Sequence, residues 1–174
     1  MKKYYFILFS LLLINGCSKN LVNWYSGNLD GALIAANNKI IMIDFYTDWW
    51  YACSLLDANT FIDENVSSYL NQNFINLKIN AESEYGKTLF SDYNGTGYPL
   101  LIFLDSKKNE LERFYGFLDP EPFLQKLIDI KNGNNTFPVL QAQYESGDNS
   151  AETMSILASK YAERGNDSVA TLLY

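Results

Sequence analysis

The sequence predicts an α/β fold in which strands of one sheet alternate with helices, followed by a helical extension. Ile40–Tyr46 is a continuous apolar run of strand length and β-branched character, typical of a strand buried on both faces. Segments with apolar residues at helical spacing lie between this run and later ones. The length of 174 residues suffices for one domain of about 100 to 150 residues and an appendage. We therefore expect one α/β domain, and two full domains are not expected.

The individual elements follow from the apolar spacing and from the turn-forming residues between the runs. Strands are expected at Ile40–Tyr46, Phe74–Ile79, Leu100–Leu104 and Glu110–Tyr115. Helices are expected at Leu29–Asn37, at Ala52–Asn71 with an interruption near Thr60–Asp63, at Ser83–Tyr93 and at Pro120–Ile130. The turn Asp105–Asn109 predicts a hairpin between the last two strands. The order is βαβα followed by ββα.

Composition excludes several classes of function. Hydrophobic residues make up 48% of the chain and charged residues 19%, which is typical of a globular protein with a core. The net charge of -7 argues against a nucleic-acid partner, because phosphate binding needs clustered Lys and Arg. The chain has no histidine, which excludes a His-ligated metal, a Cys-His pair and a Ser-His-Asp triad. No metal or other cofactor is predicted.

The N-terminus has the features of an export signal. Residues 1–16 begin with Lys2 and Lys3, followed by an apolar run from Tyr4 to Ile14. A run of 11 residues is too short for a membrane-spanning helix, which needs about 20, and fits the core of a signal peptide. The segment Ile14–Cys17 resembles the bacterial lipobox, although an asparagine at its second position is slightly unusual. A secreted protein with an incidental cysteine is the alternative.

The lipobox predicts where the protein is located. Cys17 would receive the lipid, and residues 17–22 would form a short polar tether to the membrane. The protein is then expected in the bacterial cell envelope, lipid-anchored and facing the periplasm or the exterior. Without Lys2 and Lys3, the chain has 11 basic and 20 acidic residues, a charge of -9. Cys53 is the one thiol left unmodified, so no internal disulfide can form.

The segment from Ile43 to Cys53 resembles an active site of a known superfamily. It reads Ile-Asp-Phe-Tyr-Thr-Asp-Trp-Trp-Tyr-Ala-Cys, which is similar to the thioredoxin superfamily around its Trp-Cys-x-x-Cys motif. It looks closest to the C-terminal domain of the transmembrane thiol-disulfide interchange proteins. The resemblance covers about Trp24 to Lys131. It implies a thioredoxin-like domain at 23–131, with a mixed sheet of about four to five strands flanked by helices.

Three further matches assign roles by resemblance. Trp49 matches the tryptophan that packs beside the redox site, although it could be an ordinary aromatic residue. Asp44 matches a buried acid beneath the second cysteine, where it would accept the thiol proton; an exposed strand acid is the alternative. Tyr98-Pro99 matches the cis-proline turn that presents backbone to an extended partner. Tyr51 and Tyr98 are expected to contribute to binding.

The departure from the motif lies at its first cysteine. In the family, that residue is the exposed, low-pKa nucleophile at a helix N-terminus, and here the position holds Trp50. An indole cannot attack a disulfide, so dithiol turnover is not expected. Cys53 stands at the resolving position, where shielding would raise its pKa. Trp50 has three open explanations: authentic degeneration, an inactivating substitution, or a sequence error, since Cys and Trp codons differ by one base.

Two functions remain open on this evidence. The first is a thiol-disulfide interchange relative that is inactive or limited to single-thiol chemistry through Cys53. The second is a non-catalytic module that binds an extended peptide or a thiol-containing protein client. The second would use the groove at Trp49, Trp50, Cys53 and Tyr98-Pro99, together with the C-terminal helices.

The C-terminal region at 137–174 is predicted to be a helical extension. Met154, Leu157, Ala158 and Tyr161 fall on the spacing of the first helix of a tetratricopeptide-type repeat. Two alternatives follow: the sequence is a piece of a longer repeat protein, or these helices pack back on the preceding domain. An ordinary helical hairpin would give a similar pattern.

Overall fold

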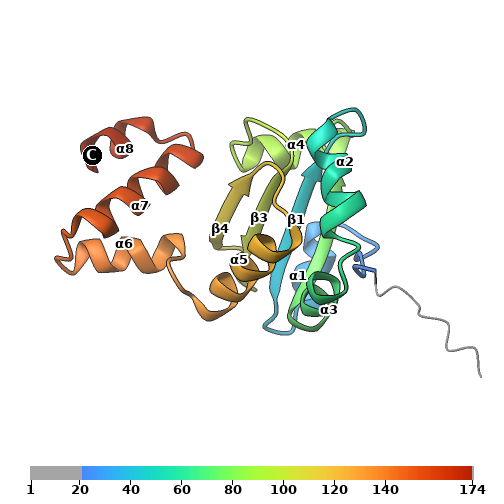
Figure 1. Ribbon diagram of the computed structural model, residues 1–174. Coiled ribbons are helices and arrows are strands. Elements are labelled where there is room, and N and C mark those ends of the chain that lie inside the picture. The colour runs from blue at the N-terminus through green and yellow to red at the C-terminus, as the bar shows by residue number, and fades with distance from the viewer. Residues whose placement is uncertain (1–20, 174) are drawn as a thin grey trace, which may run out of the picture.

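The computed structural model describes residues 21–173 and contains a mixed sheet of four strands in the order β2-β1-β3-β4 (Figure 1). The strands are β1 (Ile40–Tyr46), β2 (Phe74–Asn80), β3 (Leu100–Leu104) and β4 (Glu110–Tyr115). β1 pairs in parallel with β2 and antiparallel with β3, and β3 pairs antiparallel with β4. The predicted hairpin between the last two strands is therefore present.

Helices surround the sheet and continue beyond it. Before and between the strands lie α1 (Leu29–Ala35), α2 (Tyr51–Leu55), the π-helical turn η1 (Leu56–Thr60), α3 (Glu64–Asn73) and α4 (Glu84–Asp92). After the sheet come α5 (Pro120–Asn132), α6 (Phe137–Glu145), α7 (Ala151–Glu163) and α8 (Asp167–Leu173). The last three helices form a separate layer beside β4 (Figure 1).

The continuous apolar pattern of β1 reflects burial on both faces of the sheet. Met42 packs into one core with residues of η1, α3 and α5. Ile43 and Phe45 point to the opposite core, which includes residues of α1 and α4. The first six residues of β1 are buried, Asp44 among them. Both faces of β1 are thus covered by apolar cores, which confirms the predicted central strand. A strand buried on both faces has a continuous apolar sequence rather than an alternating one.

Several helix boundaries differ from the prediction by one or two residues: α3 ends at Asn73, α4 spans Glu84–Asp92 and α5 ends at Asn132. α1 ends at Ala35 rather than Asn37, because Asn37 and Asn38 both adopt positive φ angles, of 42° and 68°. Asparagine tolerates this left-handed conformation better than most residues do. The helix expected from Ala52 begins one residue earlier and changes to π-helical hydrogen bonding in η1 before α3 begins.

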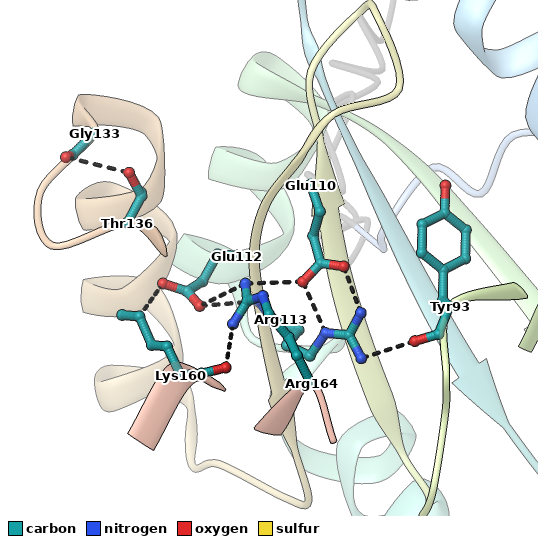
Figure 2. Close-up of polar contacts among 8 residues, drawn as sticks. All are labelled: Tyr93, Glu110, Glu112, Arg113, Gly133, Thr136, Lys160 and Arg164. Carbon is teal, nitrogen blue, oxygen red and sulfur yellow. Dashed lines mark hydrogen bonds and ion pairs between the residues drawn. The ribbon is translucent and has the colours of Figure 1, made fainter. Parts of the chain in front are cut away.

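The C-terminal helices pack back on the sheet at β4. Their own small core consists of Leu140, Leu157, Ala158 and Leu173. Charged side chains then join α7 to β4: Lys160 pairs with Glu112, and Arg164 with Glu110 (Figure 2). The extension is therefore docked on the domain, and the tetratricopeptide-type repeat stays a prediction.

The predicted signal peptide, Cys17 and most of the tether at 17–22 lie outside the described residues. Within residues 21–173, no helix has the length and hydrophobicity needed to cross a bilayer.

Candidate functional site

Three loops meet at one end of the sheet. Phe45 near the end of β1 is paired with Leu100 at the start of β3, so the loop after β1 lies beside the loop that ends in Pro99. The segment after β2 joins them, because the Ala81 N–H donates to the Tyr46 carbonyl at 2.9 Å. The sheet thus brings together the loops that hold Trp49, Trp50 and Tyr98-Pro99.

The aromatic residues of the first loop are exposed at this end. Trp49 is 62% exposed, Trp50 44% and Tyr51 74%. The two indoles meet edge to face, with centroids 5.5 Å apart. The Trp49 Nε1–H donates to Glu82 Oε1 at 3.0 Å, which ties the loop to the segment after β2. Three adjacent large aromatic side chains therefore face solvent where a partner could contact them.

Trp50 occupies the N-cap position of α2. Its backbone is extended (φ -86°, ψ 119°), and its carbonyl accepts from the Cys53 N–H at 3.0 Å. The indole makes no capping hydrogen bond. In this position a thiolate would be stabilised by the free N–H groups of the helix start, whereas an indole has no anionic form to stabilise.

Cys53 lies beneath the exposed aromatic residues and is 2% exposed. Burial raises the pKa of its thiol, and the nearby charge of Asp44 raises it further. A backbone hydrogen bond from Thr47 acts in the opposite direction without overcoming burial. The thiol is thus both shielded and held in its protonated, weakly nucleophilic form.

Asp44 is buried below the same loop, with 1% of its surface exposed. Its Oδ2 accepts from Lys78 Nζ at 2.9 Å, while Oδ1 has no hydrogen-bond partner among the described residues. Burial raises the pKa of the Asp44 carboxyl, although the charge of Lys78 lowers it. A carboxylate with a raised pKa and a free oxygen can take up a proton, and its role as the acceptor for Cys53 stays a prediction.

The loop before β3 contains a cis peptide bond between Tyr98 and Pro99. The Tyr98 ring lies against Phe90 of α4, with centroids 4.9 Å apart. The Pro99 carbonyl accepts from the Gly116 N–H at 2.9 Å, which fixes the turn to the end of β4. Helix packing on one side and a strand end on the other therefore hold this loop.

Comparison with known proteins identifies the family of the domain. A family model for the thioredoxin-like domain matches residues 28–131. The chain belongs to the thioredoxin-like family. The predicted fold class is thereby confirmed, with a mixed sheet of four strands flanked by helices and additional helices after it.

Relatives of this thioredoxin-like chain include thiol-disulfide proteins. It is 35% identical over 102 residues to the thiol:disulfide interchange protein DsbD of Yersinia pestis, covering 57% of this chain and 17% of that protein. The chain therefore spans less than a fifth of that relative. A putative disulphide-isomerase from Bacteroides thetaiotaomicron is 29% identical, with a TM-score of 0.56 over 64% of this chain and 93% of that one. A thioredoxin from Thermus thermophilus has 21% identity and a TM-score of 0.58, over 65% and 89%.

Sequence reasoning missed Lys78, the cation of the thioredoxin-like site. Lys78 stands opposite Asp44 in the β1–β2 register and also pairs with Asp57 of η1 at 2.5 Å. Its Nζ lies 4.7 Å from the Tyr46 ring centroid and 5.1 Å from that of Trp24. The signal was a lysine inside the apolar strand beside a strand with one acid, but pairing them requires the strand register. Within residues 21–173, no group of three or more His, Cys, Asp or Glu side chains could hold a metal.

Proposed function

We propose that this thioredoxin-like chain binds extended, thiol-containing protein segments at the surface formed by Trp49, Trp50, Tyr51 and the half-buried Tyr98, beside the buried Pro99, without dithiol turnover. The observation that carries the proposal is the state of the thiol. Cys53 is almost fully buried with a raised pKa, while the exposed position of the motif holds an indole. The protein is further proposed to act in the bacterial cell envelope, anchored by a lipid on Cys17.

The chemistry of exchange explains why turnover fails. Reduction of a client disulfide begins when an exposed thiolate attacks one sulfur, forming a mixed disulfide and releasing the other sulfur as a thiolate. A second thiolate then attacks the mixed disulfide, so that the pair of cysteines is oxidised and the client dithiol is reduced. Trp50 cannot take the first step, and Cys53 alone cannot store both electrons. What remains at this site is a contact surface.

Binding is tested with a fluorescently labelled, unstructured peptide that contains one alkylated cysteine, using fluorescence anisotropy. We expect Trp50→Ala to weaken binding about tenfold, which corresponds to about 1.4 kcal/mol. The matched control is Ile34→Ala, which removes another exposed apolar side chain, 88% exposed on α1, away from the site. Equal affinities of wild type and Trp50→Ala would contradict the proposal.

Turnover is tested by insulin reduction with dithiothreitol as the electron donor. We expect the wild type to be inert and Trp50→Cys to gain activity, since it restores a thiol at the start of α2 above Cys53. The double variant Trp50→Cys with Cys53→Ser should lose this activity again. Multiple turnover by the wild type would show that the chain does not need the first cysteine, and the binding-only proposal would fail.

Single-thiol exchange through Cys53 is a second candidate, favoured by the 35% identity to a thiol:disulfide interchange protein. Maleimide labelling separates the two. We expect the folded protein to react at least tenfold more slowly than the same protein in 8 M urea, because the thiol is buried and protonated. Labelling of the folded protein at the rate of the unfolded one would favour single-thiol chemistry.

The lipid anchor is tested separately in bacterial cells that express the full chain. Incorporation of radioactive palmitate into the wild type, and its loss in Cys17→Ser, is the expected result. Equal labelling of the two proteins would contradict the assignment of Cys17.

A further inference from the structure

Arg113 on β4 is a buried cation that connects two parts of the molecule. Its guanidinium donates to both oxygens of Glu110, with Nε to Oε1 at 2.7 Å and Nη2 to Oε2 at 2.5 Å. Its remaining nitrogen, Nη1, donates to the Tyr93 carbonyl at 2.8 Å. Figure 2 shows these contacts. The planar guanidinium therefore holds a carboxylate on one side and a backbone carbonyl on the other.

The Tyr93 carbonyl marks the point where the loop of the proposed binding surface begins. Tyr93 is the C-cap residue of α4, and five residues at 94–98 lead from it to Pro99. The far end of the loop is held by the bond from Gly116 to Pro99 described above. Arg113 supplies the contact at the near end. Both ends of the loop are thus tied to β4.

The C-terminal helices hold Glu110 in turn. Arg164, the C-cap residue of α7, has its Nη2 2.8 Å from Glu110 Oε1, so Glu110 is shared by two arginines. Arg164 is itself fixed, because its guanidinium lies 4.0 Å from the centre of the Phe137 ring and donates to the Lys160 carbonyl at 2.8 Å. A continuous series of contacts thus runs from α7 through Glu110 and Arg113 to Tyr93 (Figure 2).

We infer that Arg113 is a positioning residue for the Tyr98-Pro99 loop, and that the C-terminal helices help to hold it there through Arg164 and Glu110. The significance of the loop as a binding surface rests on the proposed function. The C-terminal extension thereby has a role at this loop. Of the charged contacts between the extension and β4, the one through Arg164 and Glu110 is the one that matters for the position of the loop.

A second ion pair in the same interface provides the matched control. Lys160 of α7 pairs with Glu112 of β4, and the other oxygen of that carboxylate, Oε1, also lies 3.8 Å from Arg164 Nη2. Glu112 Oε1 accepts a hydrogen bond from the Arg113 backbone N–H at 2.9 Å. Between these two residues there is no hydrogen bond from the Arg113 guanidinium. Lys160→Met therefore removes one cation from the contact with β4, as Arg164→Met does, but it leaves both arginines on Glu110.

Hydrogen exchange measured by mass spectrometry on the mature full chain tests the inference. The reporters are the amides of Tyr93, Asn94 and Gly95, which donate to Leu89, Ser91 and Phe90 carbonyls at 3.2, 2.9 and 2.9 Å. We expect Arg113→Met to speed their exchange about tenfold, and Arg164→Met to speed it several-fold. Lys160→Met should leave it unchanged. Arg113→Lys serves if Arg113→Met does not fold, since lysine keeps the charge but cannot contact Glu110 and Tyr93 as a planar fork.

Unchanged exchange of these amides in a folded Arg113 variant would overturn the inference. Equal acceleration by Arg164→Met and Lys160→Met would overturn its second half, because general loosening of α7 would then be the cause. Exchange is measured without a client, so it tests how the loop is held even if the proposed binding function is wrong. The same variants in the anisotropy assay then show whether the position of the loop affects peptide affinity.

Discussion

At the residue scale, the state of Asp44 is set by two opposing effects. Burial disfavours its charged form, and Lys78 favours it; burial is the larger effect, so the pKa of the carboxyl is raised from its ordinary value of 3.8. Lys78 is shared with Asp57, so its charge is only partly available to Asp44. The folded protein therefore holds a proton that the unfolded chain has already released.

This difference predicts how stability depends on pH. Between the unfolded and folded pKa values of Asp44, the folded state binds the extra proton, so the free energy of unfolding decreases as the pH rises through this window. Each unit of pKa difference corresponds to about 1.4 kcal/mol. Urea unfolding of the wild type and of Asp44→Asn from pH 4 to pH 7 measures it. The wild type should lose stability relative to Asp44→Asn as pH rises; a constant difference would contradict the raised pKa.

At the element scale, two helices begin with an aspartate in different hydrogen-bonding states. Asp63 caps α3, where its Oδ1 accepts from the Asn65 and Val66 N–H groups, each at 3.0 Å. Asp119 precedes α5 and makes no such bond. We expect Asp63→Ala to lower the free energy of unfolding by about 1 kcal/mol, and the control Asp119→Ala to lower it by less. Urea unfolding at constant pH measures both, and equal losses would show that the capping bonds do not contribute.

The strands were predictable from the sequence because each is short and has turn residues beside it. The first three are mainly apolar, whereas β4 contains three charged residues and was predicted from the hairpin turn at Asp105–Asn109. Ile40–Tyr46, Leu100–Leu104 and Glu110–Tyr115 have the predicted bounds, and Phe74–Asn80 is one residue longer. The π-helical turn η1 was not predictable in this way, since an extra residue per turn leaves no distinct spacing over five residues.

The candidate site was predictable only as far as its residues are close in the sequence or match the family motif. The segment from Trp49 to Cys53 and the Tyr98-Pro99 turn came from the resemblance. Lys78 and Arg113 did not, because their partners are set by strand pairing and by a helix that follows the domain. A charged residue in an apolar strand signals a buried partner without saying which one.

At the scale of the whole molecule, the C-terminal helices share buried contacts with the sheet. All three tryptophans lie between Trp24 and Trp50, whereas α6, α7 and α8 contribute helical circular dichroism from the other end of the chain. Because the buried pairs between α7 and β4 lose their partners if either part unfolds, we expect one cooperative transition. Tryptophan fluorescence and circular dichroism should give the same urea midpoint. An earlier transition by circular dichroism would mean that the extension unfolds independently.

Docking of the helices on β4 also affects whether edge strands of two molecules can pair. β4 and β2 are the outer strands of the sheet, and an outer strand with free backbone groups can pair with the strand of another molecule. The extension lies along β4, and Trp24 forms a bridge to Asn76 on β2. The proposed lipid anchor on Cys17 would confine the protein to a surface, where molecules collide often. On such a surface, the helices beside β4 and the bridge at Asn76 would leave fewer backbone groups of the outer strands free to pair with the strands of a neighbour.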